Sequence, residues 1–228
     1  SRLTHRCRGW ARRRGSNACR GAPRLDGCDH PSELRPPLPR VIPLQELTGA
    51  IIAGGRARRL NGLAKGLVNV GGESIMARQL RLLESRCIHR FIVGDPAGPY
   101  GELGVPIHAD LIASKGPPGG VHCALSYAST PWVIVLGCDL PSVTASLIDG
   151  LRVPGNHDVC WYRAAGRPQP LVSCWRRTVV DRLAAKLTAA SPGFRDLTAD
   201  LRVRELQAVE ELFFNVNTPS DLKRLRGG

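Results

Sequence analysis

The chain has 228 residues, of which 43% are hydrophobic and 22% charged, and these fractions are normal for a globular protein. The net charge of +13 is uneven, because residues 1–40 hold ten arginines against three acids and so contribute +7. No apolar run approaches the ~20 residues of a membrane span, and eight cysteines in a chain of this length do not form a small disulfide scaffold. We therefore expect a soluble protein of the reducing cytoplasm.

The first 43 residues show no helix or strand period. They contain three consecutive arginines at 12–14 and a proline-rich run at 36–39. Because proline interrupts both helices and sheets, we predict a basic, flexible leader over residues 1–43 and a folded domain over residues 44–228. Nucleic-acid binding through this leader is an alternative that we do not favour.

From Leu47 onward, short apolar runs alternate with amphipathic segments. The predicted strands cover residues 47–53, 88–93, 105–108, 132–136, 158–162, 169–174 and 203–206. The predicted helices cover residues 74–85, 120–129, 144–151, 177–190 and 194–198, and a last helix begins after Thr218 as N-cap. This alternation predicts a Rossmann-like α/β fold, in which a mostly parallel sheet carries helices on both faces as three αβα layers.

A glycine-rich loop from Gly54 to Lys65 follows the first predicted strand. The paired glycines Gly54 and Gly55 let backbone N–H groups approach phosphate oxygens, and Arg59 and Lys65 can neutralise phosphate charge. The loop is neither a Walker A motif nor a dinucleotide fingerprint. We expect it to bind a nucleoside triphosphate, although a solvated turn with surface arginines is the alternative.

Asp139 directly follows the apolar strand at 132–136 and precedes Pro141. A carboxylate at that place is costly to leave unpaired, and Mg²⁺ prefers one or two carboxylates together with phosphate oxygens. Both the metal-binding interpretation and a simple helix cap are compatible with the residues alone. Because ligands of such sheets bind beyond the carboxyl ends of the strands, the loop and Asp139 are expected to share one site.

Two further segments are weaker candidates. Residues 116–120 form a glycine-rich turn that opens a helix, where backbone donors could meet substrate. Asn215 and Asn217 alternate along an extended segment and so point to one face. They could contact substrate or metal-bound water, or simply fix the turn.

Taken together, these segments resemble the molybdenum cofactor guanylyltransferases, within the nucleotide-diphospho-sugar transferase superfamily. The matching blocks occur in the family's order: Ile52–Leu60 with Lys65–Leu67, Gly116–Gly120, Cys138–Pro141, and Asn215–Pro219. The resemblance covers residues 47–228. Three positions depart from the family pattern, because Leu60 replaces Met, Ala64 replaces Asp or Asn, and Gly94 stands where an Asn is usual.

The resemblance implies transfer of GMP from GTP to the molybdopterin cofactor, with release of pyrophosphate and with Mg²⁺ at Asp139. It implies catalytic roles for Lys65, Arg59 and Asp139, and Asn215 and Asn217 remain candidates for contact with substrate. The implied GTP-binding residues are Ile52, Ala53, Gly54, Gly55, Lys65, Asp110 and Asp139. Molybdoenzymes or chaperones are the implied acceptors of the product.

Three alternatives remain open from the sequence. The same fold could serve a cytidylyltransferase for molybdopterin, or a nucleotidyltransferase for a sugar or polyol phosphate. A nucleotide-binding regulatory module without turnover is the alternative of another class. The pterin contacts are expected from loops around Arg163–Pro170.

Overall fold

The computed structural model describes residues 41–54, 64–218, 220 and 221. The predicted leader over residues 1–43 lies almost wholly outside them, so that prediction is not tested. Within the described part of the chain, no helix combines the length and the apolar character that crossing a membrane requires.

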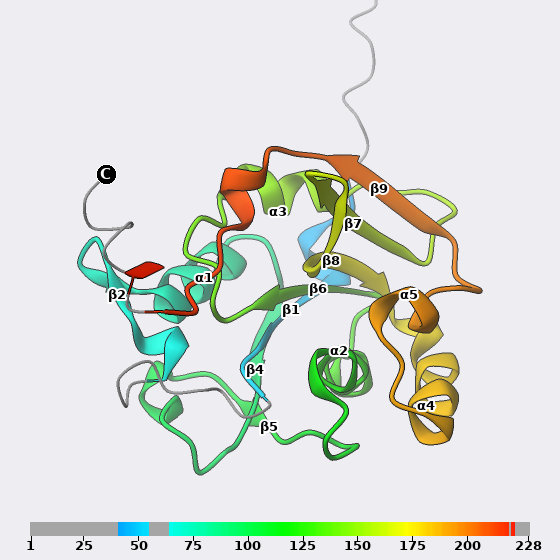
Figure 1. The fold of residues 1–228 in the computed structure, drawn as a ribbon, viewed down its shortest axis with the longest axis horizontal. Helices are drawn as coiled ribbons and strands as arrows, with labels where there is room; N and C mark the ends of the chain where they lie inside the picture. Colours follow the sequence, from blue (N-terminus) through cyan, green and yellow to red (C-terminus); the bar gives the residue numbers. More distant parts are fainter. Residues whose placement is uncertain (1–40, 55–63, 219, 222–228) are drawn as a thin grey trace, which may run out of the picture. The chain divides into compact units, whose positions relative to one another are not determined.

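A seven-stranded sheet runs through the domain in the order β5–β4–β1–β6–β8–β7–β9 (Figure 1). Its strands are β1 (Leu47–Ile52), β4 (His89–Val93), β5 (Ile107–His108), β6 (Trp132–Gly137), β7 (Val159–Ala164), β8 (Arg167–Arg176) and β9 (Val203–Gln207). All neighbouring pairs are parallel except those of β8, which is antiparallel to β6 and to β7. The predicted, mostly parallel sheet is confirmed.

The two central strands are β1 and β6, which pair in parallel from Leu47 opposite Trp132 to Ile52 opposite Gly137. Every residue of both strands is buried. Strands that are covered on both faces carry nearly continuous apolar runs rather than alternating ones. Apart from Thr48, both strands follow this pattern, and this is why the sequence pattern locates them correctly. Their shared register brings both carboxyl ends to the same edge of the sheet.

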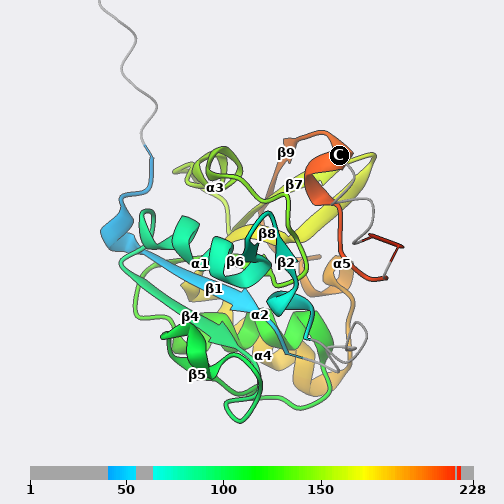
Figure 2. The same ribbon diagram turned by 90° about the vertical axis from the view of Figure 1, so that its left-hand side faces the viewer.

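Helices cover both faces of the sheet, which confirms the predicted three layers (Figures 1 and 2). One core forms where α1 (Ile75–Glu84) and α3 (Ala145–Leu151) pack on the first face. A second core forms where α2 (Gly116–Tyr127), α4 (Val180–Ala189) and α5 (Phe194–Leu197) pack on the other. The 3₁₀ turns are η1 (Leu44–Glu46), η2 (Lys65–Leu67), η3 (Gly101–Leu103), η4 (Arg177–Val179) and η5 (Glu210–Phe213).

Two local structures differ from the sequence prediction. A small hairpin of β2 (Asn69–Val70) and β3 (Glu73–Ser74) is not predicted, since strands of two residues carry no periodic signal. The segment expected to be a loop around Arg163–Pro170 is a tight hairpin between β7 and β8. Its two turn residues, Ala165 and Gly166, have positive φ values of 47° and 73°, as a two-residue turn between twisted strands requires.

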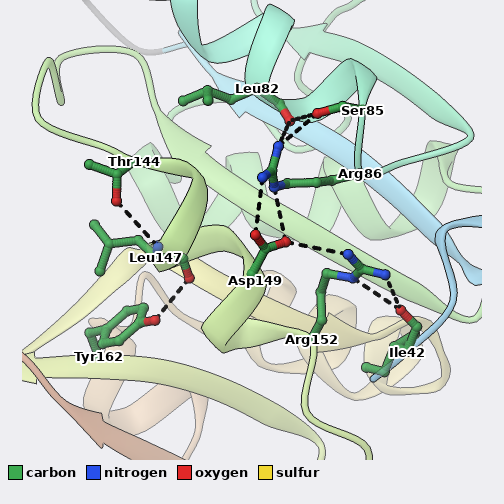
Figure 3. A network of polar contacts seen from close by, with 9 residues as sticks. All are labelled: Ile42, Leu82, Ser85, Arg86, Thr144, Leu147, Asp149, Arg152 and Tyr162. Atoms are coloured by element: carbon green, nitrogen blue, oxygen red, sulfur yellow. Dashed lines mark hydrogen bonds and ion pairs between the residues drawn. The ribbon is translucent and has the colours of Figure 1, made fainter. Parts of the chain in front are cut away.

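A polar network joins α1, α3 and the incoming chain (Figure 3). The Asp149 carboxylate accepts two hydrogen bonds of 3.0 Å from the Arg86 guanidinium and one of 3.3 Å from Arg152. Arg152 also donates to the Ile42 carbonyl oxygen at 2.9 Å and 3.1 Å. These bonds fasten the two helices of the first layer to the segment that leads into β1.

Candidate active site

The predicted shared site lies where β1 and β6 end side by side. The backbone N–H of Cys138, just after β6, donates to the carbonyl oxygen of Ile52 at the end of β1, at 3.2 Å. Ala53 and Gly54 continue from β1, and Asp139 continues from β6. The loop and the aspartate therefore start from adjacent points, as the strand pattern predicts.

Three segments that are distant in the sequence meet at this edge. The Lys65 ammonium donates to the side-chain oxygen of Asn217 and lies 3.9 Å from the Asp139 carboxylate. The backbone N–H of Val216 donates to the Asp139 carbonyl oxygen at 2.9 Å. The side chains of Lys65 and Asp139 are only 16% and 24% exposed. The structure thus joins the loop, the end of β6 and the closing segment in one constellation.

A capping box fixes the closing segment. The Asp221 carboxylate accepts hydrogen bonds from the backbone N–H groups of Asn217 and Thr218, at 2.8 Å and 2.7 Å. The Asp221 N–H donates back to the Thr218 hydroxyl at 3.2 Å. This reciprocal arrangement is typical of a helix start and confirms Thr218 as the predicted N-cap. Asn217 is thereby held at the edge where it meets Lys65.

The Asp139 carboxylate does not cap helix α3. Helix α3 begins only at Ala145, and the Thr144 hydroxyl caps it by accepting from Leu147 N–H at 3.3 Å. Burial raises the pKa of Asp139, and the Lys65 ammonium lowers it only in part. The helix-cap interpretation of Asp139 is therefore wrong. The negative charge of the Asp139 carboxylate is only partly compensated by Lys65.

Asp110 follows β5 and reaches the start of the loop. A Cβ atom placed on Gly54 would lie 2.9 Å from a carboxylate oxygen of Asp110, so the absence of a side chain lets the two segments touch. Although the residue as a whole is exposed, partial desolvation of its carboxyl group raises the pKa of Asp110. Gly94 lies beside Ala53, where an added Cβ would make an ordinary contact of 3.7 Å. The site therefore has room for a small side chain at position 94.

Two expectations fall on residues that the structure does not describe. Gly55 and Arg59 lie within residues 55–63, outside the described part of the chain. Their proposed contacts with phosphate stay predictions. Ile52, Ala53, Gly54, Lys65, Asp110 and Asp139 are described, and all lie at or next to the carboxyl edge of the sheet.

The glycine-rich turn at residues 116–120 is itself the first turn of α2, four residues earlier than predicted. Prolines 117 and 118 have no N–H group, and the N–H of Gly119 already donates to the Lys115 carbonyl oxygen at 3.4 Å. The segment therefore offers fewer free backbone donors than a glycine-rich turn suggests. Proline is compatible with the first helical turn, which explains why the helix starts there.

A cavity of 630 Å³ adjoins the constellation, and the sequence predicts only part of its wall. Its lining residues are Ser142, Glu210, Glu211, Phe213, Phe214, Asn215 and Asn217. Asn215 and Asn217 are exposed and flank the buried Val216, so the predicted alternation is confirmed. Ser142 and the two glutamates carry no motif signal, although the glutamates directly precede the predicted closing segment.

The cysteines of the domain are structural. Cys87, Cys123, Cys138, Cys160 and Cys174 are buried, and burial raises the pKa of the Cys138 thiol to about 12. A thiol with such a pKa stays protonated at neutral pH and packs as a small apolar group. All five of these cysteines belong to the buried hydrophobic core.

The comparisons with known proteins agree with this geometry. The profile of the family described as "MobA-like NTP transferase domain" matches residues 49–209. A probable molybdenum cofactor guanylyltransferase of Pelotomaculum thermopropionicum is 33% identical over 190 residues, which cover 79% of this chain and 92% of that relative.

Solved structures share the fold. The molybdopterin-guanine dinucleotide biosynthesis protein A of Archaeoglobus fulgidus superposes with a TM-score of 0.65 at 23% identity, over 79% of this chain and 97% of that one. A Mycobacterium tuberculosis protein whose structure was solved in complex with manganese gives a TM-score of 0.54 at 18% identity, over 79% and 98%.

Proposed function

Since the chain belongs to the family of MobA-like NTP transferase domains, we propose that it transfers GMP from GTP to the molybdopterin cofactor and releases pyrophosphate. The observation that carries the proposal is the meeting of Lys65, Asp139 and Asn217 at the carboxyl ends of β1 and β6. A cation, a carboxylate and an amide are held there beside a cavity, at the edge where such sheets bind ligands.

In the reaction, a terminal phosphate oxygen of molybdopterin forms a bond to the α-phosphorus of GTP. The bond between the α-phosphorus and its bridging oxygen breaks, and pyrophosphate leaves with the electron pair. The attacking oxygen is already anionic, so no protein base is required. The protein contributes in-line positioning and stabilisation of the phosphate charge.

Lys65 supplies fixed positive charge. Its ammonium group is mostly buried and is held between Asn217 and Asp139. A cation restrained in this way does not have to reorganise when charge develops on the phosphates. We assign to Lys65 the binding of GTP phosphate oxygens and the stabilisation of the leaving pyrophosphate. Arg59, outside the described residues, would add a second positive charge.

Asp139 fits a divalent metal ion. No group of three or more potential ligands from His, Cys, Asp and Glu occurs among the described residues, so the ion would take most of its ligands from phosphate and water, with Asp139 as the protein carboxylate. That ligand set is typical of Mg²⁺, which we propose as the ion. When bound, it would neutralise charge on the triphosphate. The raised pKa of Asp139 indicates that its carboxylate lacks full compensation without such a cation.

The two substrates would approach from opposite sides of Asp139. Asp110 follows β5, and Gly54 follows β1, which places the nucleotide-side candidates toward one end of the sheet. The 630 Å³ cavity lies toward the other end, because Phe213 in its wall packs on Tyr162 of β7 with ring centres 5.6 Å apart. We propose that GTP occupies the first side and that molybdopterin enters the cavity, next to Asn215 and Asn217.

Arg163 and the hairpin after it are poor candidates for pterin contacts. The Arg163 guanidinium donates to both carboxylate oxygens of Glu205 at 2.7 Å and to the carbonyl oxygen of Gly166 at 2.5 Å. Its donors are therefore engaged within the protein, and the cavity beside Asn217 is the better candidate for the pterin.

The proposal is tested by incubating the full chain with molybdopterin, Mg²⁺ and each of the four nucleoside triphosphates in turn. We expect pyrophosphate release and a molybdopterin guanine dinucleotide, identified by mass, with GTP only. A dinucleotide made from CTP would show that the chain transfers a cytidylyl group and not a guanylyl group. A parallel incubation replaces molybdopterin by a sugar phosphate, and turnover in that incubation alone would overturn the proposed acceptor. Nucleotide binding without pyrophosphate release would indicate a regulatory module. Transfer of the product to molybdoenzymes and a cytoplasmic location stay predictions.

A further inference from the structure

Gln79 is a buried polar residue on the inward face of α1. Its exposed fraction is 1%, and its helix neighbours on that face are apolar, namely Met76, Leu80 and Leu83. A polar side chain at such a position is costly unless its hydrogen bonds are made. Its partners therefore indicate what it is for.

The side-chain amide of Gln79 spans the segment that carries Asp139. Its nitrogen donates to the carbonyl oxygen of Gly137 at 2.8 Å and to that of Leu140 at 3.0 Å. Both partners are acceptors only, so the nitrogen and not the oxygen of the amide must face them. One side chain thus ties together the two ends of the four-residue turn 137–140.

The same helix supports Lys65. A Cβ atom on Gly66 would lie 2.8 Å from the terminal methyl of Met76, so Gly66 rests directly on α1. Met76 and Gln79 are three residues apart and share one face of the helix. Helix α1 therefore contacts both segments, because Met76 packs against η2 and Gln79 forms hydrogen bonds to the turn after β6. Lys65 and Asp139, which neighbour these two contacts in the chain, lie 3.9 Å apart.

Packing alone does not explain the amide. The side-chain oxygen of Gln79 is buried and has no hydrogen-bond partner among the described residues. An apolar side chain of similar shape would fill the same space without leaving that acceptor unpaired. Such a side chain could not supply the two hydrogen bonds that the Gln79 amide donates.

We propose that Gln79 is a positioning residue that holds the turn 137–140 in the conformation in which Asp139 can bind the metal ion of a metal–nucleotide complex. The inference rests on the proposed function, in which Asp139 is the metal ligand. Residues that orient metal ligands in this way typically change metal affinity about 10- to 100-fold when they are removed.

The experiment compares the binding of GTP in the presence of Mn²⁺, used as the probe in place of Mg²⁺, with its binding in EDTA, by calorimetric titration of the full chain in the absence of molybdopterin. The variant is Gln79→Met, which keeps the length of the side chain but removes both donors. The matched control is Thr130→Val, because Thr130 also makes two buried hydrogen bonds, to the Thr48 hydroxyl at 2.7 Å and to the Trp132 carbonyl oxygen at 2.9 Å. Thr130 precedes β6 and so lies at the end of that strand opposite to Asp139.

We expect Gln79→Met to weaken Mn²⁺–GTP binding about 10- to 100-fold while GTP binding in EDTA changes less than about twofold. Thr130→Val should change neither. A general loss of structure would weaken both kinds of binding, so an equal loss would overturn the proposal, as would an unchanged Mn²⁺–GTP affinity.

A milder variant serves if Gln79→Met does not fold. Gln79→Glu retains the shape of the side chain and, as a protonated buried acid, one donor. Its Mn²⁺–GTP affinity should fall below that of the wild type, and wild-type affinity would contradict the proposal. Dinucleotide synthesis by the wild type is assayed separately. If the wild type makes the dinucleotide and the Gln79 variant keeps its Mn²⁺–GTP affinity, the inference about Gln79 is wrong and the proposed function is retained.

Discussion

Replacing Lys65 by Met tests the charge on which the proposed reaction depends. The substitution keeps the apolar stem of the side chain and removes the ammonium group, which is held by Asn217 and lies 3.9 Å from the Asp139 carboxylate. A unit charge acting over about 4 Å at an effective dielectric constant of about 20 is worth roughly 4 kcal/mol. The Lys65 side chain is 16% exposed, so solvent screens part of this, and about 3 kcal/mol is a reasonable net loss toward a phosphate oxygen.

A loss of about 3 kcal/mol corresponds to a fall of about 100-fold in kcat/KM for GTP. The assay is pyrophosphate release at varied GTP and saturating molybdopterin, with Lys65→Arg as the control that keeps the charge. We expect Lys65→Arg to retain more activity than Lys65→Met, although the planar guanidinium does not reproduce the ammonium geometry. Activity of Lys65→Met within threefold of the wild type would refute the assignment of Lys65 to the phosphates.

The remaining predictions concern Asp139, Gly54 and Asp158. Asp139→Asn should lower turnover by roughly 1,000-fold through loss of the metal ligand. The variant should nevertheless unfold at an equal or higher temperature at pH 7, because burial raises the pKa of Asp139 and the folded state therefore disfavours its charge. A marked fall in melting temperature would contradict this. Gly54→Ala should raise KM for GTP about tenfold, since the new Cβ would lie where the backbone is expected to approach phosphate. Stability should be preserved, because the exposed Asp110 side chain can move away from the new Cβ. An unchanged KM would remove Gly54 from the site. The side chain of Asp158 is 8% exposed, and its hydrogen bonds with Arg202 lower its pKa to about 2. Asp158→Asn should therefore lower the free energy of unfolding at pH 7, measured by urea denaturation, by about 2 kcal/mol. Because a lowered carboxyl pKa stabilises the fold above pH ~4, this difference should disappear as the pH falls through ~2; a constant difference would reject the ion pair as its cause.

The features that are predictable from the sequence are those with a local signal. The strands at 47–52 and 132–137 are apolar except for Thr48, and the first is followed closely by glycine while the second ends in it. This pattern by itself predicts that Gly54 and Asp139 lie at one edge of a sheet. Thr218 is recognisable as an N-cap from its own neighbours. Lys65 and Asn217 are recognisable through motif spacing, although that spacing does not reveal their direct contact across 152 residues.

The features that the sequence does not predict depend on contacts between distant segments. Gln79 interrupts the apolar face of its helix, and its role appears only when that helix lies under the end of β6. The cavity wall at Glu210 and Glu211 likewise requires η5 to fold back beside Ser142. The hairpin turn at Ala165 resembles a loop in the sequence because alanine gives little sign of the positive φ that it adopts there.

The electrostatics of the edge explain why a metal–nucleotide complex suits it better than either component alone. A free triphosphate would meet the Lys65 charge but also the nearby Asp139 carboxylate, which repels it. A free cation would meet Asp139 but also the ammonium group 3.9 Å away. Bound together, the cation faces Asp139 and the phosphate oxygens face Lys65, so each protein charge has a partner of opposite sign. If Asp139 binds the metal ion as proposed, the separation of these two groups would favour the complex over either component. The metal dependence of GTP binding should then respond to Gln79, which contacts neither the metal ion nor the nucleotide.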